Sequence, residues 1–199
     1  MTKETIVALR RETGAGISDI HKALEEAGGD QAKALELLKK RGQAKALKKQ
    51  DRETSEGIVH AYVHGNGRVG VLIEVACETD FVARNEDFQS FVHDIALQVA
   101  ATNPRYLSVE DIPEEVKAKE LSLAKERLEE EGKLAGKDAT IIDKILEGSF
   151  AKFVEAEALL AQSSIKEESQ TIKDLLVAIT AKVGENVQIK RFTRYEIGQ

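Results

Sequence analysis

The chain has few of the residues that form crosslinks, hold metals or carry covalent chemistry. Its 199 residues include one cysteine, one methionine, two prolines, four histidines and no tryptophan. A single cysteine excludes an intramolecular disulfide and is typical of proteins in a reducing cytosol. Cys77 follows an expected buried strand, so we predict that its thiol packs in the interior and carries no chemistry.

Long apolar runs and a strong charge of either sign are also missing. No segment approaches the roughly 20 apolar residues that a membrane span needs, and Met1–Thr5 has no apolar region behind a basic start. The hydrophobic fraction of 42% and the net charge of −6 describe a globular protein in which a general affinity for nucleic acid is not favoured. We expect a soluble cytoplasmic protein without membrane contact or direct nucleic-acid binding; the plastid stroma is the other compartment open to it.

The usual patterns of a catalytic or metal site are absent from the sequence. His60 and His64 share a strand face, but they stand too far apart for easy shared ligation. The glycine-rich Gly65–Gly70 lies in an expected hairpin and lacks the lysine-hydroxyl pair of a phosphate loop. No serine has the context of an activated nucleophile. The sequence therefore predicts a protein that is not an enzyme and that needs no metal or cofactor.

Residues 3 to about 41 carry the apolar periodicity of three short helices. The expected helices run from Lys3 to Glu12, from Ser18 or Asp19 to Gly28, and from Asp30 to Gly42. Their expected apolar faces contain Ile6, Val7, Leu9, Ile20, Ala23, Leu24, Ala34, Leu35, Leu37 and Leu38. So small a core is typical of a docking module, and the pattern is similar to ubiquitin-associated domains.

A basic segment, Lys39–Arg52, follows and completes a first domain of residues 1–54. It holds seven lysines and arginines against the single acid Asp51. One interpretation is a binding surface for RNA or for an acidic partner, and the other is a solvated linker helix. We favour the linker, because no aromatic residues interleave the charges to stack on bases.

Residues 55–199 have the pattern of a second domain with an α+β fold. The β-branched runs Ile58–His64 and Arg68–Val75 flank an Asn-Gly turn and predict a β-hairpin. Helices are expected at about 86–101, 114–131, 139–160 and 171–182, and a strand at 187–197. We therefore predict an antiparallel sheet packed with helices, and a projecting helical hairpin at about 114–153 that turns at Gly132–Gly136.

The segment Glu74–Asn85 places Asp80 and Phe81 where a strand gives way to a helix. Loops held between rigid elements often carry binding residues. On the residues alone, an ordinary structural role is the more common one: Asp80 caps the helix and Phe81 packs beneath it as a hydrophobic staple.

Three separated motifs, Thr13–Gly16, Thr79–Val82 and Val183–Val187, together resemble the elongation factor Ts family. The resemblance covers nearly the whole chain and implies guanine-nucleotide exchange on elongation factor Tu. It implies that magnesium is dislodged from that GTPase by a wedge of four residues, Thr79, Asp80, Phe81 and Val82. It also implies a contact from the N-terminal module through Arg10, Gly14, Ala15, Gly16 and Ile17.

Two features depart from the pattern of the family that this chain resembles. Bacterial members often have two bulky apolar residues where this chain has Ile17 and Ser18, and some have lysine where His21 stands. Only one set of core strands is present, as in short members that dimerise. The resemblance therefore implies a homodimer that binds two molecules of elongation factor Tu. Gln188–Tyr195 is either its dimer contact or an ordinary strand of the sheet.

Two other functions compete with nucleotide exchange. An adaptor for peptides or ubiquitin-like proteins would act through residues 1–54 alone and would not need Phe81. An RNA-binding protein acting through Lys39–Arg52 would lose affinity steeply with salt.

Overall fold

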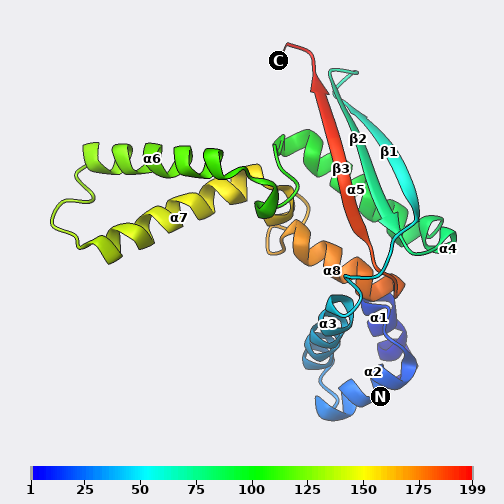
Figure 1. Cartoon of the computed structure of the whole chain (residues 1–199). Helices are drawn as coiled ribbons and strands as arrows, with labels where there is room; N and C mark the ends of the chain where they lie inside the picture. The colour runs from blue at the N-terminus through cyan, green and yellow to red at the C-terminus, as the bar shows by residue number, and fades with distance from the viewer. Residues whose placement is uncertain (1, 199) are drawn as a thin grey trace. The chain divides into compact units, whose positions relative to one another are not determined.

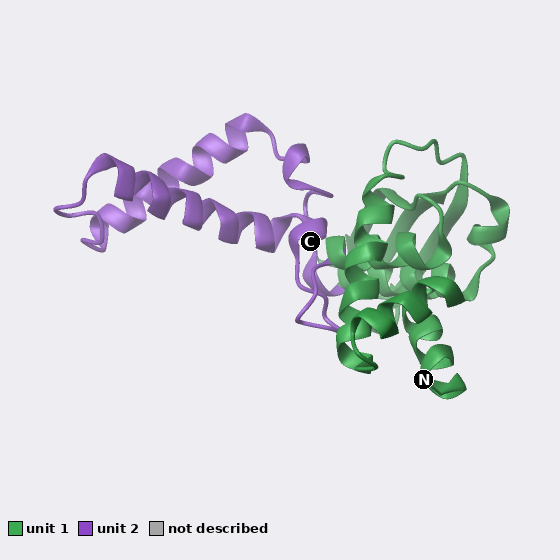
Figure 2. Ribbon diagram, turned by 90° about the horizontal axis from the view of Figure 1, so that it is seen from below, with its two compact units in different colours: residues 1–100, 173–199 green, residues 101–172 purple. Residues whose placement is uncertain are grey.

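The computed structural model describes residues 2–198. The chain forms two compact units: one contains the residues up to 100 and those from 173 onward, and the other contains residues 101–172 (Figure 2). The predicted domain boundary, between residues 1–54 and 55–199, stays a prediction.

The first unit begins with a module of three helices, as predicted. These are α1 (Lys3–Thr13), α2 (Ile17–Glu26) and α3 (Gln31–Leu47) (Figure 1). Asp30 caps α3, because its carboxylate accepts hydrogen bonds from the N–H groups of Ala32 and Lys33. The buried core of the module consists of Leu9, Ile20, Ala23, Leu24, Ala34 and Leu38.

Three details of the module differ from the sequence prediction. Helix α2 begins directly after Gly16, two or three residues before the predicted caps Ser18 or Asp19. Helix α3 continues through Gly42 to Leu47, because this glycine serves a close helix contact rather than a helix end: an added Cβ would lie 3.1 Å from the Cβ of Ala181. Val7, expected on the apolar face of α1, is 58% exposed.

The unit also contains an antiparallel sheet of three strands in the order β1 (Glu56–His64), β2 (Val69–Cys77) and β3 (Gln188–Glu196). The predicted hairpin is confirmed: β1 pairs with β2 from Glu56↔Cys77 to His64↔Val69. Asn66 in its turn has a positive φ of 57°, as asparagine tolerates.

One face of the sheet is covered by α5 (Glu86–Thr102), which lies along it (Figure 1). His60 of β1 contacts His93 of α5, and Arg194 of β3 donates a hydrogen bond to the carbonyl of Ala100. The side chains of β2 on this face, Val71, Ile73 and Val75, are buried. Since helices are combined with an antiparallel sheet, the predicted α+β class is confirmed.

The second unit contains the predicted helical hairpin. Its helices are α6 (Glu114–Glu130) and α7 (Ala139–Glu157), and the connection between them includes Gly132 and Gly136 with positive φ values of 67° and 73°. Helix α7 ends earlier than predicted, because the next residues form the 3-10 turn η2 (Leu159–Ala161). Another 3-10 turn, η1 (Val109–Asp111), precedes α6.

Helix α8 (Ile172–Val183) begins at the boundary between the units and leads to β3. None of the helices in residues 2–198 is long and apolar enough to cross a membrane.

Candidate functional site

The connection between β2 and α5 contains a one-turn helix, α4 (Asp80–Ala83). Thr79 is its N-cap, in extended conformation, and its hydroxyl oxygen lies 3.5 Å from the N–H of Val82. The prediction that Asp80 caps the helix after the strand is therefore wrong, because Asp80 lies inside a separate short helix. Helix α5 is capped separately by Asn85, whose side-chain oxygen accepts hydrogen bonds from the N–H groups of Asp87 and Phe88.

Phe81 stands on the outer side of α4. Its side chain is 79% exposed, the highest exposure among the large apolar residues of the described chain. The next two residues, Val82 and Ala83, are buried and hold the helix to the body of the unit. The interpretation of Phe81 as a staple beneath α5 is therefore wrong. An exposed ring on an anchored turn has an apolar surface free to bind a partner.

Asp80 lies beside the ring and forms an ion pair with Arg84 at 2.6 Å. Both side chains are well exposed, so water screens the pair and its contribution to stability is small. The carboxylate can exchange Arg84 for another cation at little cost.

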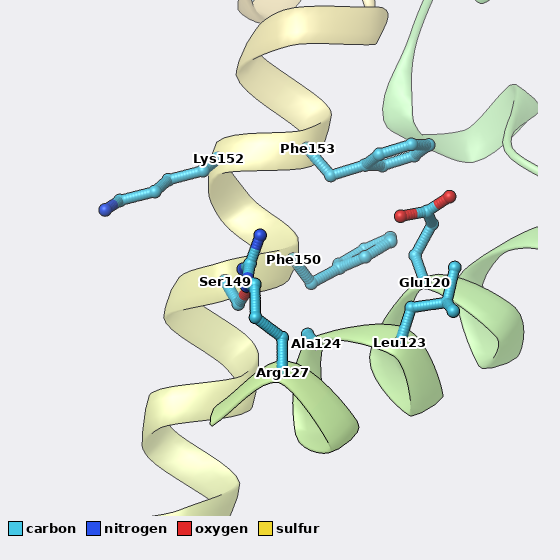
Figure 3. Close-up of a pocket in the computed structure, with 8 residues that line it drawn as sticks. All are labelled: Glu120, Leu123, Ala124, Arg127, Ser149, Phe150, Lys152 and Phe153. Carbon is cyan, nitrogen blue, oxygen red and sulfur yellow. The ribbon is translucent and has the colours of Figure 1, made fainter. Parts of the chain in front are cut away.

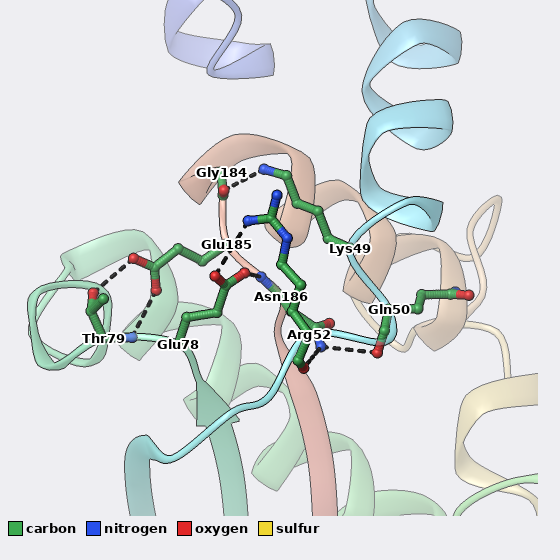
Figure 4. A network of polar contacts seen from close by, with 8 residues as sticks. All are labelled: Lys49, Gln50, Arg52, Glu78, Thr79, Gly184, Glu185 and Asn186. Atoms are coloured by element: carbon green, nitrogen blue, oxygen red, sulfur yellow. Dashed lines mark hydrogen bonds and ion pairs between the residues drawn. The ribbon is translucent and has the colours of Figure 1, made fainter.

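Glu185 fixes the start of α4 from a distant part of the sequence. One carboxylate oxygen accepts a hydrogen bond from the N–H of Thr79 at 3.0 Å, and the other accepts one from its hydroxyl at 2.7 Å (Figure 4). The neighbouring Glu78 accepts a 2.6 Å hydrogen bond from the N–H of Asn186. The loop after α8 thus forms hydrogen bonds with both residues that precede α4, Glu78 and Thr79.

The same loop is tied to the segment that follows α3. The side-chain amide of Asn186 donates to the carbonyls of Gln50 and Arg52, at 3.0 and 2.8 Å. Lys49 donates to the carbonyl of Gly184, and the guanidinium of Arg52 lies 3.3 Å from Glu78 (Figure 4). Residues 49–52, 78–79 and 184–186 therefore form one polar network.

Val183–Val187 was predicted only as a motif of the family resemblance, and its role in holding α4 was not predicted. A signal was present: Glu185 and Asn186 are polar side chains between a helix and a strand, where the chain must be fixed by side-chain hydrogen bonds.

Cys77 directly precedes Glu78 of the network and is fully buried. Its Sγ lies 3.1 Å from the carbonyl of Thr79. Burial, with the nearby Glu185 carboxylate, raises the pKa of the thiol to about 11. The thiol therefore stays protonated at neutral pH and packs as a small apolar group, as predicted.

The second group of predicted residues surrounds the turn between α1 and α2. Gly14 ends α1 with a φ of 65°, and its N–H donates to the carbonyl of Arg10 at 2.8 Å. A Cβ at Gly14 would lie 2.6 Å from the carbonyl oxygen of Lys182, so the turn packs directly on the end of α8. Ile17 is 51% exposed, whereas Ala15 packs against the core of the module.

The two predicted groups are thus linked through one short segment. Gly14 contacts Lys182, and Thr79 bonds Glu185, three residues further along. A change at the end of α8 is expected to reach both groups.

The basic segment Lys39–Arg52, which begins inside α3 and continues beyond it, is largely neutralised by nearby acids. Four of its cations form ion pairs within the helical module: Lys39 with Glu12, Lys40 with Glu36, Arg41 with Glu26, and Lys45 with Asp19. Lys49 and Arg52 belong to the polar network. This pairing argues against an RNA-binding stripe, because phosphates would have to displace acids that are already in place.

The described part of the chain contains no group of three or more histidine, cysteine or acidic side chains arranged to hold a metal ion. The site around Thr79–Val82 offers an exposed aromatic ring, a carboxylate and a rigid support. These features are more typical of a site that binds another protein than of a site that makes or breaks bonds.

Comparison with known proteins identifies similar sequences along nearly the whole chain. The family model described as "Elongation factor TS" matches residues 31–199. The chain is 50% identical over 194 residues to "Elongation factor Ts" of Moorella thermoacetica, a match that covers 98% of this chain and 94% of that protein. It is 50% identical over 191 residues to the protein of the same name from Coprothermobacter proteolyticus, covering 96% and 95%. With the Carboxydothermus hydrogenoformans protein the identity is 47% over 199 residues, covering 100% and 90%.

Proposed function

The chain belongs to the elongation factor Ts family of translation elongation factors, and from this premise we propose that it is a guanine-nucleotide exchange factor for elongation factor Tu. It would bind the GDP-loaded GTPase, displace magnesium and release the nucleotide. In this role it catalyses no bond change of its own and needs no cofactor.

The physical requirement is differential affinity. A GTPase holds GDP through phosphate contacts and a magnesium ion that bridges phosphate and protein oxygens. A partner speeds release only if it binds the distorted, magnesium-poor form better than the loaded form. The exchange factor therefore needs a rigid projection that fits the GTPase only after it has been distorted.

The observation that carries the proposal is the exposure of Phe81, 79%, on a helix turn that is itself anchored. Buried Val82 holds the turn from below, and Thr79 is held by Glu185. An aromatic anchor contributes roughly 2–4 kcal/mol to an interface, which corresponds to a rate change of about 30- to 1000-fold if it acts only in the distorted state. Since the ring is already presented to solvent, little binding energy is lost in ordering it.

The other predicted residues divide into contact and support. Asp80 is placed to draw a cation of the GTPase away from its usual partner, with Arg84 released in exchange. In the N-terminal module the exposed Arg10 and Ile17 are the proposed contacts. Gly14, Ala15 and Gly16 set the shape of the turn that carries them.

The proposal is tested by stopped-flow release of a fluorescent GDP analogue from elongation factor Tu. The intact protein should accelerate release strongly, and Phe81→Ala should lose at least about tenfold of that acceleration while keeping its melting temperature. Val109→Ala, which shortens an exposed apolar side chain in η1, serves as the control and should exchange normally. Absence of any acceleration by the intact protein would overturn the proposal.

We also propose that the protein works as a homodimer that binds two molecules of elongation factor Tu. The face of the sheet opposite α5 supports this. By strand register Val59, Val63, Leu72 and Tyr195 share that face, and they are 64%, 66%, 46% and 74% exposed. Apolar patches of this kind on a soluble protein are usually interaction sites. A second copy of the same face is the proposed occupant, and β3 contributes to it through Tyr195.

Sedimentation equilibrium tests the dimer directly. The intact protein should have twice the mass of one chain, and Leu72→Glu should shift it to monomer, because two carboxylates would be buried near the dyad axis. A monomeric intact protein would contradict the dimer and leave the exchange proposal standing.

A further inference from the structure

The helical hairpin carries a groove that the proposed exchange site does not use. Two hollows of about 450 and 430 Å³ lie between α6 and α7 and share Arg127, Ser149 and Lys152, so they form one continuous groove. Each helix lines it with positions three and four residues apart, as one face of a helix does. Between Lys144 and Phe153 of α7 the groove extends for about 15 Å.

Apolar side chains of this groove are only partly covered by the rest of the chain. No described residue of α7 is buried, although the helix has an apolar stripe that includes Ile145, Phe150 and Phe153. The two rings stack with their centroids 5.9 Å apart and are directed toward α6 (Figure 3), and Leu123 across from them is 48% exposed. A third helix laid into the groove would bury more of these side chains.

Gly148 is a second feature of the groove that indicates a binding partner. It lies in the interior of α7 and lines the groove. Glycine destabilises a helix interior relative to alanine, and nothing in the chain requires it here, because an added Cβ would meet no atom within 4 Å. Since no contact within the chain requires glycine at this position, it is consistent with the close approach of a partner's backbone.

The charges on the rim select the kind of partner. Arg127, Lys144 and Lys152 line the groove, and none of them forms a direct ion pair within residues 2–198. Glu131 on the same rim already pairs with Lys133 at 2.7 Å, and Glu120 lies at the opposite end, beside the two rings. A basic rim on a chain of net charge −6 matches an acidic partner.

We propose that this groove binds an amphipathic helix of another protein, with its apolar stripe on Phe150 and Ile145 and acidic residues against Arg127 and Lys152. The helix would pass closest at Gly148 and complete a three-helix bundle. This proposal does not depend on the exchange function, since none of its residues belongs to the Thr79–Val82 site.

The test uses the full chain and a labelled probe peptide of about 14 residues, with leucines at helical spacing and glutamates flanking the stripe. Fluorescence anisotropy should show saturable binding. Lys152→Glu should weaken it at least about fivefold, whereas Lys119→Glu, the same charge change on α6 outside the groove, should not. A peptide with lysine in place of glutamate should not bind.

Gly148→Ala gives a readout that a general loss of folding cannot imitate. The melting temperature should rise by about 2–4 °C, while the affinity for the probe should fall, because the new methyl group occupies the point of closest approach. Four results would overturn the proposal: no binding of the acidic peptide, equal binding of both peptides, unchanged affinity in Lys152→Glu, or unchanged affinity in Gly148→Ala. Probe binding that is displaced by single-stranded RNA and falls steeply with salt would assign the groove to nucleic acid instead.

Discussion

The carboxylate of Glu185 accepts two hydrogen bonds from Thr79, one from the backbone N–H and one from the hydroxyl, across 106 positions of the sequence. Thr79 caps the turn that presents Phe81. The position of the exposed ring is therefore set by the loop after α8, a segment far from it in the sequence.

Replacing Glu185 with alanine should test this coupling. The change removes two hydrogen bonds to a charged acceptor and leaves the N–H of Thr79 without its partner, at a cost of about 2 kcal/mol in the free energy of unfolding. Nucleotide exchange should fall more than stability alone explains, because α4 loses its fixed position. Urea unfolding and stopped-flow exchange, measured at a temperature where the variant stays folded, separate the two effects.

Glu185→Gln is the matched control. An amide can still accept from the N–H of Thr79 while its own N–H donates to the hydroxyl, so both losses should be smaller than in the alanine variant. Normal exchange by a folded Glu185→Ala protein would mean that α4 holds its position without this contact.

The order and type of the longer helices and strands could be predicted from the sequence, since apolar periodicity and turn residues are local signals, whereas the short α4, η1 and η2 were not predicted. The places where prediction failed depend on contacts between distant segments. Gly42 has the features of a helix end, but α3 continues through it, because it packs on Ala181 of α8. The hydrogen bonds between Glu185 and Thr79 likewise join two segments that no local sequence pattern connects.

The residues of the candidate site were predicted from the sequence, but their geometry was not. An aromatic after a strand has the same local pattern whether it packs beneath a helix or projects into solvent, so the exposure of Phe81 could not be derived from its neighbours in sequence. Asp80 was predicted to cap the long helix, but a separate short helix, α4, precedes α5, and Asn85 caps α5.

Gly14→Ala should loosen the contact between the N-terminal module and α8. The residue has a φ of 65°, and its new Cβ would meet the backbone of Lys182 at 2.6 Å, where no flexible side chain can move aside. Left-handed strain costs about 1–2 kcal/mol, and the clash adds to it. Urea unfolding should therefore show a loss of at least about 2 kcal/mol.

Two other glycines separate strain from contact. Gly28 has a φ of 62° with open space around it, and Gly16 has neither a positive φ nor a close neighbour. Gly28→Ala should show the strain alone, and Gly16→Ala should change stability by a few tenths of a kcal/mol at about the level of a cap substitution. Equal losses for Gly14 and Gly28 would mean that the Lys182 contact relaxes freely.

The thiol of Cys77 should be unreactive in the folded protein. A pKa of about 11 in place of 9.0 leaves roughly a hundredth as much thiolate at pH 7.5, and burial blocks access as well. Labelling with a disulfide reagent should be more than about 100-fold slower than in urea-unfolded chain. Fast labelling under native conditions would show that the region around Cys77 opens readily.

Stability should fall as the pH drops below about 6.5, and His60 should account for part of the loss. Burial, with the charge of the neighbouring His93, lowers the pKa of His60 in the folded protein. The two rings lie with Nε2 of His60 and Nδ1 of His93 3.3 Å apart, and Tyr62 packs edge-on against His93.

The folded form thus binds fewer protons than the unfolded chain between the ordinary pKa of histidine, 6.5, and the lowered pKa of His60. The stabilisation is complete above that range and is lost on passing down through it. Free energies of unfolding at pH 7.5 and 5.5 should differ less in His60→Gln than in the intact protein. An identical difference in His60→Gln would place the pH dependence on other groups.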